Sequence, residues 1–299
     1  MDQLSLLIDA KNQLGECVLW CDRSRRVFWT DILAARLHAY SVVDGEMQTW
    51  EMPERLSCFA LTEGDDRLLL GLASRLAFFE LSSGLLTPIC PVEDHLPTTR
   101  INDGRCDRQG RFVFGTMNEA PGKPAIGSFY RLNADLSLQR LPLPSVSISN
   151  SICFSPDGQS MYYCDSLQRI IYRWDAYAEG SEGQQHKLVD LSDEVAEPDG
   201  STIDADGFLW NAQWAAGRVV RYAQDGSVDR ILTLPVSQPS CVCLGGEQFD
   251  QLFVTSARQS LSVEDIAAQA LAGGLFHTQL QGVHGLAENR FAGHAGAAS

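Results

Sequence analysis

A small set of polar residues could bind a metal ion together if the fold brings them to one place. Glu16 lies between Gly15 and the apolar run 17–20, where it has no role in a turn. A buried carboxylate without a partner is costly, so Glu16 needs a cation or a proton nearby. Asn150 and Asp199 stand at the start of other predicted strands. Two carboxylates and an amide form an oxygen-ligand set that Ca²⁺, Mg²⁺ and Mn²⁺ prefer, and that Zn²⁺ and Fe²⁺ accept.

A six-fold repeat indicates how these residues could be brought together. A short strand, a polar turn and a strand rich in aromatic and β-branched residues recur along the chain. Aligned on positions 28, 68, 112, 161, 208 and 252, the copies are separated by 40, 44, 49, 47 and 44 residues. Six copies with a period near 45 residues are typical of propeller blades. The turns carry glycine where a tight hairpin needs positive φ, as in 108–110, 156–158 and 205–207.

Each copy has room for four strands. Third strands are expected at 37–40, 129–132, 170–174 and 219–222, and fourth strands at 48–50, 138–141, 187–189 and 230–232. The N-terminal segment 4–8 precedes the first copy, and the last copy lacks a fourth strand, so we expect segment 4–8 to complete that blade and close the ring. A helix over 263–271 with Ser262 as N-cap is expected inside the last blade. The sequence thus predicts an all-β fold, a six-bladed β-propeller over residues 1–292, with a disordered tail at 293–299.

In a propeller the first strand of each blade lines the central channel, and all six first strands start at the same mouth. Five polar residues lie near these starts, at 12, 12, 10, 11 and 9 residues before the aligned position, namely Glu16, Arg100, Asn102, Asn150 and Asp199. They therefore lie at nearly the same height in four blades. Asp199-Gly200 and 102–104 are also good turn sequences, so their convergence, and not any one residue, predicts the metal site. Trp214, at the end of a second strand, could wall this mouth or belong to the core or surface.

Composition limits the partners. The chain of 299 residues has a net charge of −15 and no basic stripe, which argues against nucleic acid and anionic membranes. The N-terminus has no basic and apolar leader pattern, and no stretch of about 18 apolar residues is present. The nine cysteines form no CxxC pair and are interpreted as reduced core residues. We therefore expect a cytoplasmic protein, monomeric or a small homo-oligomer.

Several segments resemble one known family, the senescence marker protein-30 (regucalcin)/gluconolactonase/luciferin-regenerating enzyme family of six-bladed sugar lactonases. The matching segments span roughly residues 14 to 280 in family order and spacing, and comprise 14–16 (LGE), 100–104 (RINDG), 115–117 (GTM), 149–151 (SNS) with 154–158 (FSPDG), 198–200 (PDG) and 217–222 (GRVVRY). Each segment is short, but together they are specific. Family members often have glycine after the metal-binding asparagine, where this chain has Ser151.

The resemblance implies roles for individual residues. It implies that Glu16, Asn150 and Asp199 are the ligands of one divalent metal ion (Ca²⁺, Mg²⁺, Mn²⁺, Zn²⁺ or Fe²⁺). It also implies that Arg100 and Asn102 bind the hydroxyl and ring oxygens of the substrate. A further substrate carboxylate follows the Thr-Met of the third blade. That position is assigned to Glu119, although the register of some members places Ala120 there.

The function implied is hydrolysis of a sugar lactone, an aldonolactone such as L-arabinonolactone or gluconolactone, to the aldonic acid by metal-activated water. Asp199 is the candidate catalytic residue that accepts the proton of the water. Three alternatives remain open from the sequence: a related propeller esterase or phosphotriesterase, a calcium-binding regulatory or scaffold propeller without turnover, and a sugar-binding module.

Overall fold

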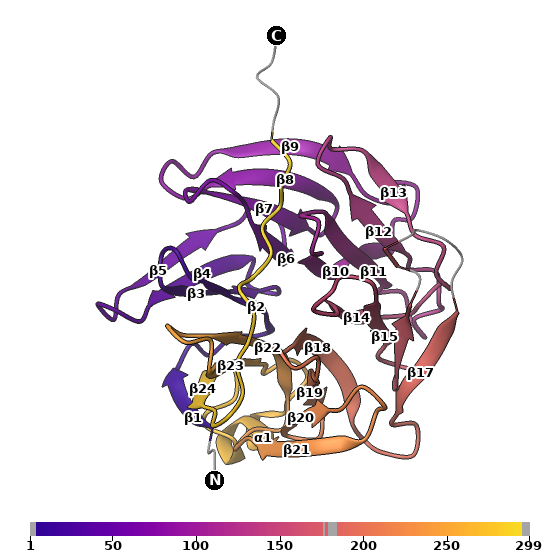
Figure 1. Cartoon of the computed structure of the whole chain (residues 1–299). Helices are drawn as coiled ribbons and strands as arrows, with labels where there is room; N and C mark the ends of the chain where they lie inside the picture. Colours follow the sequence, from indigo (N-terminus) through magenta and orange to yellow (C-terminus); the bar gives the residue numbers. More distant parts are fainter. Residues whose placement is uncertain (1–3, 176, 179–183, 295–299) are drawn as a thin grey trace.

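The computed structural model describes residues 4–175, 177–178 and 184–294, and almost all of its regular structure is β. The strands form six antiparallel sheets of four, set radially around a central axis (Figure 1). This confirms the predicted six-bladed β-propeller. Among the described residues no helix is long and apolar enough to cross a membrane.

The blades follow one another along the chain. Blade 1 contains β2 (Gly15–Cys21), β3 (Arg26–Asp31), β4 (Arg36–Ser41) and β5 (Met47–Glu51). Blade 2 contains β6 (Leu56–Leu61), β7 (Arg67–Leu72), β8 (Arg75–Glu80) and β9 (Leu86–Pro91). Blade 3 contains β10 (Thr99–Cys106), β11 (Phe112–Asn118), β12 (Phe129–Leu132) and β13 (Leu138–Arg140).

The second half of the ring repeats this order. Blade 4 contains β14 (Ser149–Phe154), β15 (Met161–Asp165), β16 (Ile170–Trp174) and β17 (Gln185–Asp190). Blade 5 contains β18 (Glu197–Ile203), β19 (Leu209–Trp214), β20 (Arg218–Tyr222) and β21 (Val228–Thr233). Blade 6 contains β22 (Pro239–Gly245), β23 (Gln251–Ser256), β24 (Leu275–Gln279) and, from the other end of the chain, β1 (Ser5–Ile8).

The N-terminal strand closes the ring, as predicted. β1 pairs antiparallel with β24, with Ser5 opposite His277 and Leu6 opposite Phe276. The outer edge of blade 6 is thereby made by the first described strand of the chain, which joins the two ends of the ring without a covalent link. The pairing also covers an edge strand that would otherwise expose unpaired backbone groups.

The predicted helix is present inside blade 6 but is shorter than expected. α1 spans Val263–Ala268 between β23 and β24, and Ser262 caps it through a reciprocal capping box with Asp265. The prediction of a helix reaching Leu271 was wrong, because the chain continues in turns after Gln269. None of the helical residues is buried, so no apolar face holds further turns against the propeller.

Every first strand carries a local break in its pairing close to the mouth. In β2, β10, β14, β18 and β22 two residues are left unpaired, and in β6 one. In blades 1 and 4 the unpaired residues follow Glu16 and Asn150, and in blade 5 they include Asp199. Such bulges bend a strand and re-aim its side chains. Cys17 and Ser151, which follow Glu16 and Asn150, have φ of 46° and 61°.

The core consists of apolar side chains packed between neighbouring blades, with large buried aromatics such as Trp29, Phe59 and Trp210. All nine cysteines are free, and eight of them are buried. Blades 5 and 6 approach each other so closely that a Cβ on Gly200 would lie 2.5 Å from the Cys241 Sγ. A glycine after Asp199 is therefore required by packing, and not only by a turn.

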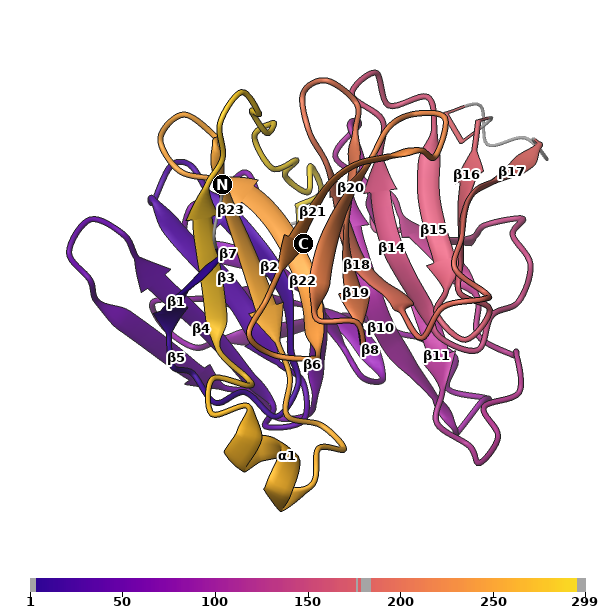
Figure 2. The ribbon, with the colours of Figure 1, turned by 90° about the horizontal axis from the view of Figure 1, so that it is seen from below.

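A C-terminal strap, residues 280–294, crosses the end of the ring away from the mouth, a feature that the sequence did not reveal. In Figure 2 this strap lies at one end of the ring and α1 projects from the other. The strap leaves blade 6 and reaches blades 2 and 3, where the Phe291 N–H donates to the Leu61 carbonyl at 2.7 Å and the Ala292 N–H to the Gly110 carbonyl at 2.9 Å. Glu288 pairs with the buried Arg105 of β10 at 3.0 Å, so the strap is also bound to an inner strand. The predicted tail at 293–299 falls mostly on residues 295–299, which lie outside the described residues.

Phe291→Ala should destabilise the fold, because this side chain anchors the strap in the core. Phe291 is fully buried and its ring lies 6.1 Å from that of Phe78. Removing a buried phenylalanine side chain costs about 3–5 kcal/mol of unfolding free energy, which urea denaturation would measure. His294→Ala, at an exposed position of the same strap, is the matched control and should change stability little. A loss below about 1 kcal/mol for Phe291→Ala would show that the strap is not part of the cooperative fold.

Candidate functional site

The mouth of the propeller holds a cavity of about 510 Å³, within the range of ordinary small-molecule sites. Its floor is made by the first strands of four blades. Five predicted site residues line it, namely Glu16, Arg100, Asn102, Asn150 and Asp199. The structure therefore brings together side chains separated by up to 183 residues, as the common height of their strands predicted.

Glu16 and Asp199 form the electrostatic centre of the cavity. Their carboxyl groups are within hydrogen-bonding reach of each other, and both residues line the cavity. Burial, together with the nearby Asp103 carboxylate, raises the pKa of Glu16 to about 8. Burial and the Glu16 charge raise the pKa of Asp199 well above its usual range. Two acids that resist ionisation side by side form a site that favours a cation.

Asp103 follows Asn102 in β10 and has a structural role. Its Oδ1 accepts from the Gly104 N–H at 2.8 Å, and its Oδ2 accepts from the Ile152 N–H at 2.9 Å. The bond from Ile152 ties blade 3 to blade 4. Burial raises the pKa of Asp103, and its negative charge adds to that of the two carboxylates above it.

Arg100 supplies positive charge beside the acids and is held by several partners. Its side chain is 6% exposed, and burial lowers its pKa despite the neighbouring Glu119. Its Nη1 donates to the Asn102 Oδ1 at 2.7 Å, to the Ile101 carbonyl at 2.8 Å and to the Ser57 Oγ at 3.3 Å. Much of its hydrogen-bonding capacity is thus spent on the protein, which fixes the plane of the guanidinium.

Glu119, the remaining predicted substrate residue, does not line the cavity. Arg55 binds its carboxylate with two bonds of 2.6 and 2.8 Å, and the Arg100 Nε donates to it at 3.1 Å. These contacts lower the pKa of Glu119, with Arg55 the main cause. In this arrangement Glu119 orients Arg100 from outside the cavity.

The rim of the cavity adds further residues to those of the inner strands. Lys123, on the loop between β11 and β12, lines the wall and has no ion-pair partner within the described residues. Trp214 also lines the cavity. Of the positions that the sequence left open for it, the structure therefore shows the wall of the mouth. Trp214 packs against a small apolar cluster of Leu14, Ile32 and Ala257. Leu261 also lines the cavity, so the lining contains apolar side chains as well as the positive charge of Lys123.

The donor atoms at the centre fit a divalent cation. Across the described parts of the chain, no three or more His, Cys, Asp or Glu side chains are grouped to hold a metal. A cation at the mouth would therefore rest on two carboxylates and one amide oxygen. The Asp199 Oδ1 is buried and has no hydrogen-bond partner, so it is available as a ligand or a proton acceptor. Such an oxygen is costly unless something binds it.

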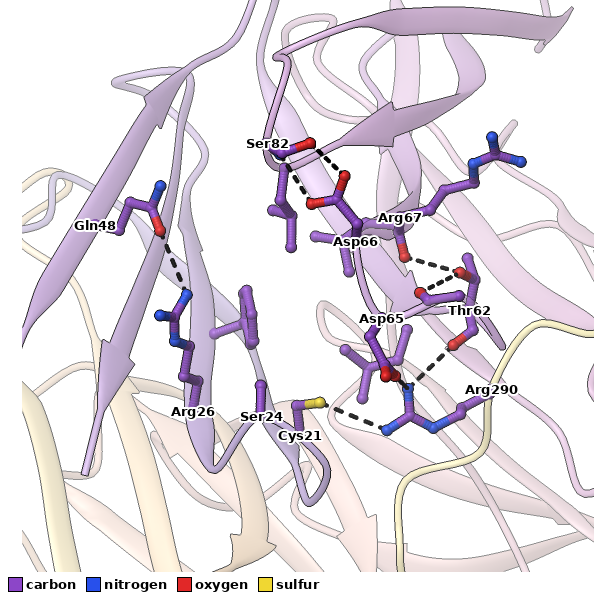
Figure 3. Close-up of a pocket in the computed structure, with 15 residues that line it drawn as sticks. Cys21, Ser24, Arg26, Gln48, Thr62, Asp65, Asp66, Arg67, Ser82 and Arg290 are labelled. Atoms are coloured by element: carbon purple, nitrogen blue, oxygen red, sulfur yellow. Dashed lines mark hydrogen bonds and ion pairs between the residues drawn. The ribbon is translucent and has the colours of Figure 1, made fainter. Parts of the chain in front are cut away.

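A second cavity, of about 180 Å³, lies between blades 1 and 2 at the opposite end of their first strands (Figure 3). Its polar groups already bind one another. Asp66 accepts from the Ser82 N–H at 2.9 Å as well as from its hydroxyl, and the Arg290 Nη1 donates to the Thr62 carbonyl at 3.0 Å. This cavity contains none of the predicted residues and no buried unpaired acid, so the mouth is the better candidate of the two for a functional site.

Known proteins share both the fold and the length of this chain. It is 50% identical over 292 residues to the L-arabinolactonase of Azospirillum brasilense, covering 97% of this chain and 96% of that protein. It is 33% identical over 293 residues to the 6-deoxy-6-sulfogluconolactonase of Pseudomonas putida, covering 98% and 99%. The solved structure of regucalcin from Agrobacterium tumefaciens, described as a calcium-binding protein, superimposes with a TM-score of 0.90 at 31% identity and covers 96% of each chain.

The family model described as SMP-30/Gluconolactonase/LRE-like region matches residues 14–258. This range includes five of the six blades and every predicted site residue. The resemblance inferred from the short sequence segments is confirmed, and the chain belongs to the SMP-30/gluconolactonase/LRE-like family.

Proposed function

We propose that this protein is a sugar lactonase that opens an aldonolactone to the aldonic acid at the propeller mouth, with a divalent cation on Glu16, Asn150 and Asp199. The observation that carries the proposal is the convergence of these three side chains in one cavity. Its chemistry agrees with the activity named for the Azospirillum relative, which shares half of its residues with this chain. L-Arabinonolactone is therefore the first substrate to test, and gluconolactone the second.

The cation supplies Lewis-acid chemistry when bound, since it polarises an ester carbonyl and lowers the pKa of water. Glu16 and Asp199 would hold it by charge, and the Asn150 Oδ1 by its dipole. Their raised pKa values agree with this role, because each acid has to lose its proton when a cation binds. The calcium-binding description of the Agrobacterium regucalcin makes Ca²⁺ one candidate among the divalent ions.

The chain's own residues account for the proton transfers. Water adds its oxygen to the lactone carbonyl carbon and gives a proton to the Asp199 carboxylate, whose Oδ1 has no other partner. The bond between the carbonyl carbon and the ring oxygen then breaks, and the ring oxygen takes up the proton held by Asp199 to become a hydroxyl, which regenerates the carboxylate. The net reaction consumes one water and yields a carboxylic acid, which ionises at neutral pH.

The remaining side chains of the cavity recognise the sugar. Asn102 and the fixed Arg100 guanidinium offer donors to hydroxyl and ring oxygens, as the family resemblance implied. Lys123 can attract the anionic product or an acidic substituent. Trp214 and Leu261 offer an apolar surface to the C–H face of a sugar ring and limit the access of bulk water. A cytoplasmic location is also proposed, and the nine free cysteines support it.

The purified protein should hydrolyse L-arabinonolactone and gluconolactone faster than their spontaneous hydrolysis, as measured with a pH indicator. Stripping with a strong chelator should abolish the activity, and returning a divalent ion should restore it, because the site is rich in oxygen ligands. A phosphotriester and a simple aryl ester serve as comparison substrates. Activity on these esters without lactone hydrolysis, or activity that survives chelation and dialysis, would contradict the proposal.

Asp199→Asn should reduce kcat/KM for the lactone at least about 100-fold, because the amide cannot accept the proton of the water and is a weaker ligand. The metal-free variant should melt at or above the temperature of the metal-free wild type, because a buried acid has been removed. Asp206→Asn, on an exposed turn of the same blade, is the matched control and should leave kcat/KM unchanged. Asp199→Asn with near-normal turnover would remove Asp199 from the catalytic role.

The stability of the metal-free protein should fall as the pH rises from about 5 to about 9. The folded pKa of Glu16, about 8, lies above the ordinary value of 4.5, so the folded protein retains a proton that the unfolded chain loses. The stabilisation from this proton is complete below pH 4.5 and is lost as the pH passes 8. Thermal melting with chelator and with Ca²⁺ would measure it, since the ion should raise Tm more at high pH. Glu16→Gln should remove much of the slope, and a metal-free wild type as stable at pH 9 as at pH 5, relative to this variant, would contradict the assignment.

A further inference from the structure

Asn150 can serve as a metal ligand only when its amide oxygen, and not its NH₂ group, points into the cavity. The two ends of an amide have the same shape, so the hydrogen-bonding partners must decide which end faces which way. Ser166 is one of these partners. It directly follows β15, is 4% exposed, and lines the cavity beside Asn150.

The polarity of the Ser166 hydroxyl sets one side of the amide. Its Oγ lies 2.8 Å from the Pro198 carbonyl and 2.9 Å from the Asn150 Nδ2. A carbonyl cannot donate, so Ser166 spends its single hydrogen on Pro198. Toward Asn150 it can then only accept, so the NH₂ group must face Ser166. The Oδ1 is turned away from Ser166.

A second chain of bonds reaches Asn150 from the opposite side and requires the same orientation. The Arg100 guanidinium has only donors, so its Nη1 fixes the Asn102 oxygen at 2.7 Å. The Asn102 NH₂ group then donates to the Ser149 carbonyl at 2.9 Å and to the Asn150 Oδ1 at 3.3 Å. The Pro198 carbonyl can only accept and the Arg100 guanidinium can only donate. Acting through Ser166 and Asn102, they fix the orientation of the Asn150 amide from its two sides.

We infer that Ser166 is a positioning residue for the candidate metal site, because its hydroxyl fixes which end of the Asn150 amide is offered to the cation. Its bond to the Pro198 carbonyl also joins blade 4 to blade 5. Pro198 directly precedes Asp199, another of the candidate metal ligands. The inference rests on the proposed cation site but not on the identity of the substrate. Residues that orient metal ligands typically contribute 10- to 100-fold to metal affinity.

Ser166→Ala tests the inference with little disturbance elsewhere. The Pro198 carbonyl keeps a donor in this variant, because the Cys164 thiol lies 3.4 Å from it. The Asn150 NH₂ group, by contrast, loses its acceptor, so the amide is free to turn. Ser166→Thr retains the hydroxyl and is the conservative rescue variant. Ser256→Ala is the matched control, since its buried hydroxyl donates to the Gly274 carbonyl at 2.8 Å outside the cavity.

The measurement is the affinity of metal-stripped full-length protein for Ca²⁺, and separately for Zn²⁺, by titration calorimetry. Ser166→Ala should bind at least about 10-fold more weakly than the wild type, and Ser166→Thr and Ser256→Ala within about 3-fold of it. At saturating metal, kcat of Ser166→Ala should return close to the wild-type value. Wild-type affinity in Ser166→Ala, an equal loss in Ser256→Ala, or a wild type that binds neither ion would overturn the inference.

A parallel lactone assay separates this inference from the proposed function. A wild-type protein that binds the ion but hydrolyses no lactone would refute the lactonase while the affinity series still decides the role of Ser166. A wild-type protein that hydrolyses lactones, together with a Ser166→Ala variant of unchanged affinity, would refute the role of Ser166 alone.

Discussion

The placement of two acids, Glu16 and Asp199, side by side at the floor of one cavity is the constraint on which the mouth of this propeller depends. Burial raises the pKa of both, Asp103 raises that of Glu16 further, and the charge of Glu16 raises that of Asp199 further. Only a proton or a cation between them relieves the cost of ionising both. The strands that carry them are held from behind by the packing of whole blades, so the acids cannot move apart. The fold therefore supplies the free energy that keeps a charged site assembled before any ligand binds.

A ring makes this possible only if it cannot open. Glu16 lies in the first blade and Asp199 in the fifth, so any spreading of the ring would change the distance between them. Two features of the chain oppose such spreading. The pairing of β1 with β24 joins the two ends of the ring at its outer edge. The strap then crosses the far end of the channel and is held there by Glu288 on Arg105 and by Phe291 in the core. The pairing at the outer edge and the strap across the axis thus both hold Glu16 and Asp199 at a fixed separation.

Periodicity explains why so much of this arrangement was predictable from the sequence. The six second strands carry strong apolar patterns, and their spacing places every first strand by counting backward. Glu16, Asn150 and Asp199 belong to those first strands, so their convergence followed from the repeat itself. The family resemblance added the roles of Arg100 and Asn102, but the structure shows how the first orients the second.

The features that the sequence missed have no such period. Lys123 belongs to a loop whose path depends on its own turns, and nothing in a strand pattern indicates where its side chain ends. Glu119 directly follows β11, where its contact with Arg55 of the preceding blade decides its direction. The strap has no alternating pattern because it crosses several blades instead of joining a sheet. The helix ended early because none of its residues is buried against the propeller.

This division also assigns chemistry and specificity to different parts of the molecule. The side chains on the inner strands are fixed by blade packing and by bonds that allow one orientation, as for the Asn150 amide, so they suit the step common to all lactones. The rim includes Trp214 at the end of β19 and the loop residues Leu261 and Lys123. A loop can change length or sequence without disturbing the ring, because it carries little of the core. Under the proposed function, the inner strands would therefore set the position of the ester, and the rim would determine which sugar fits above it.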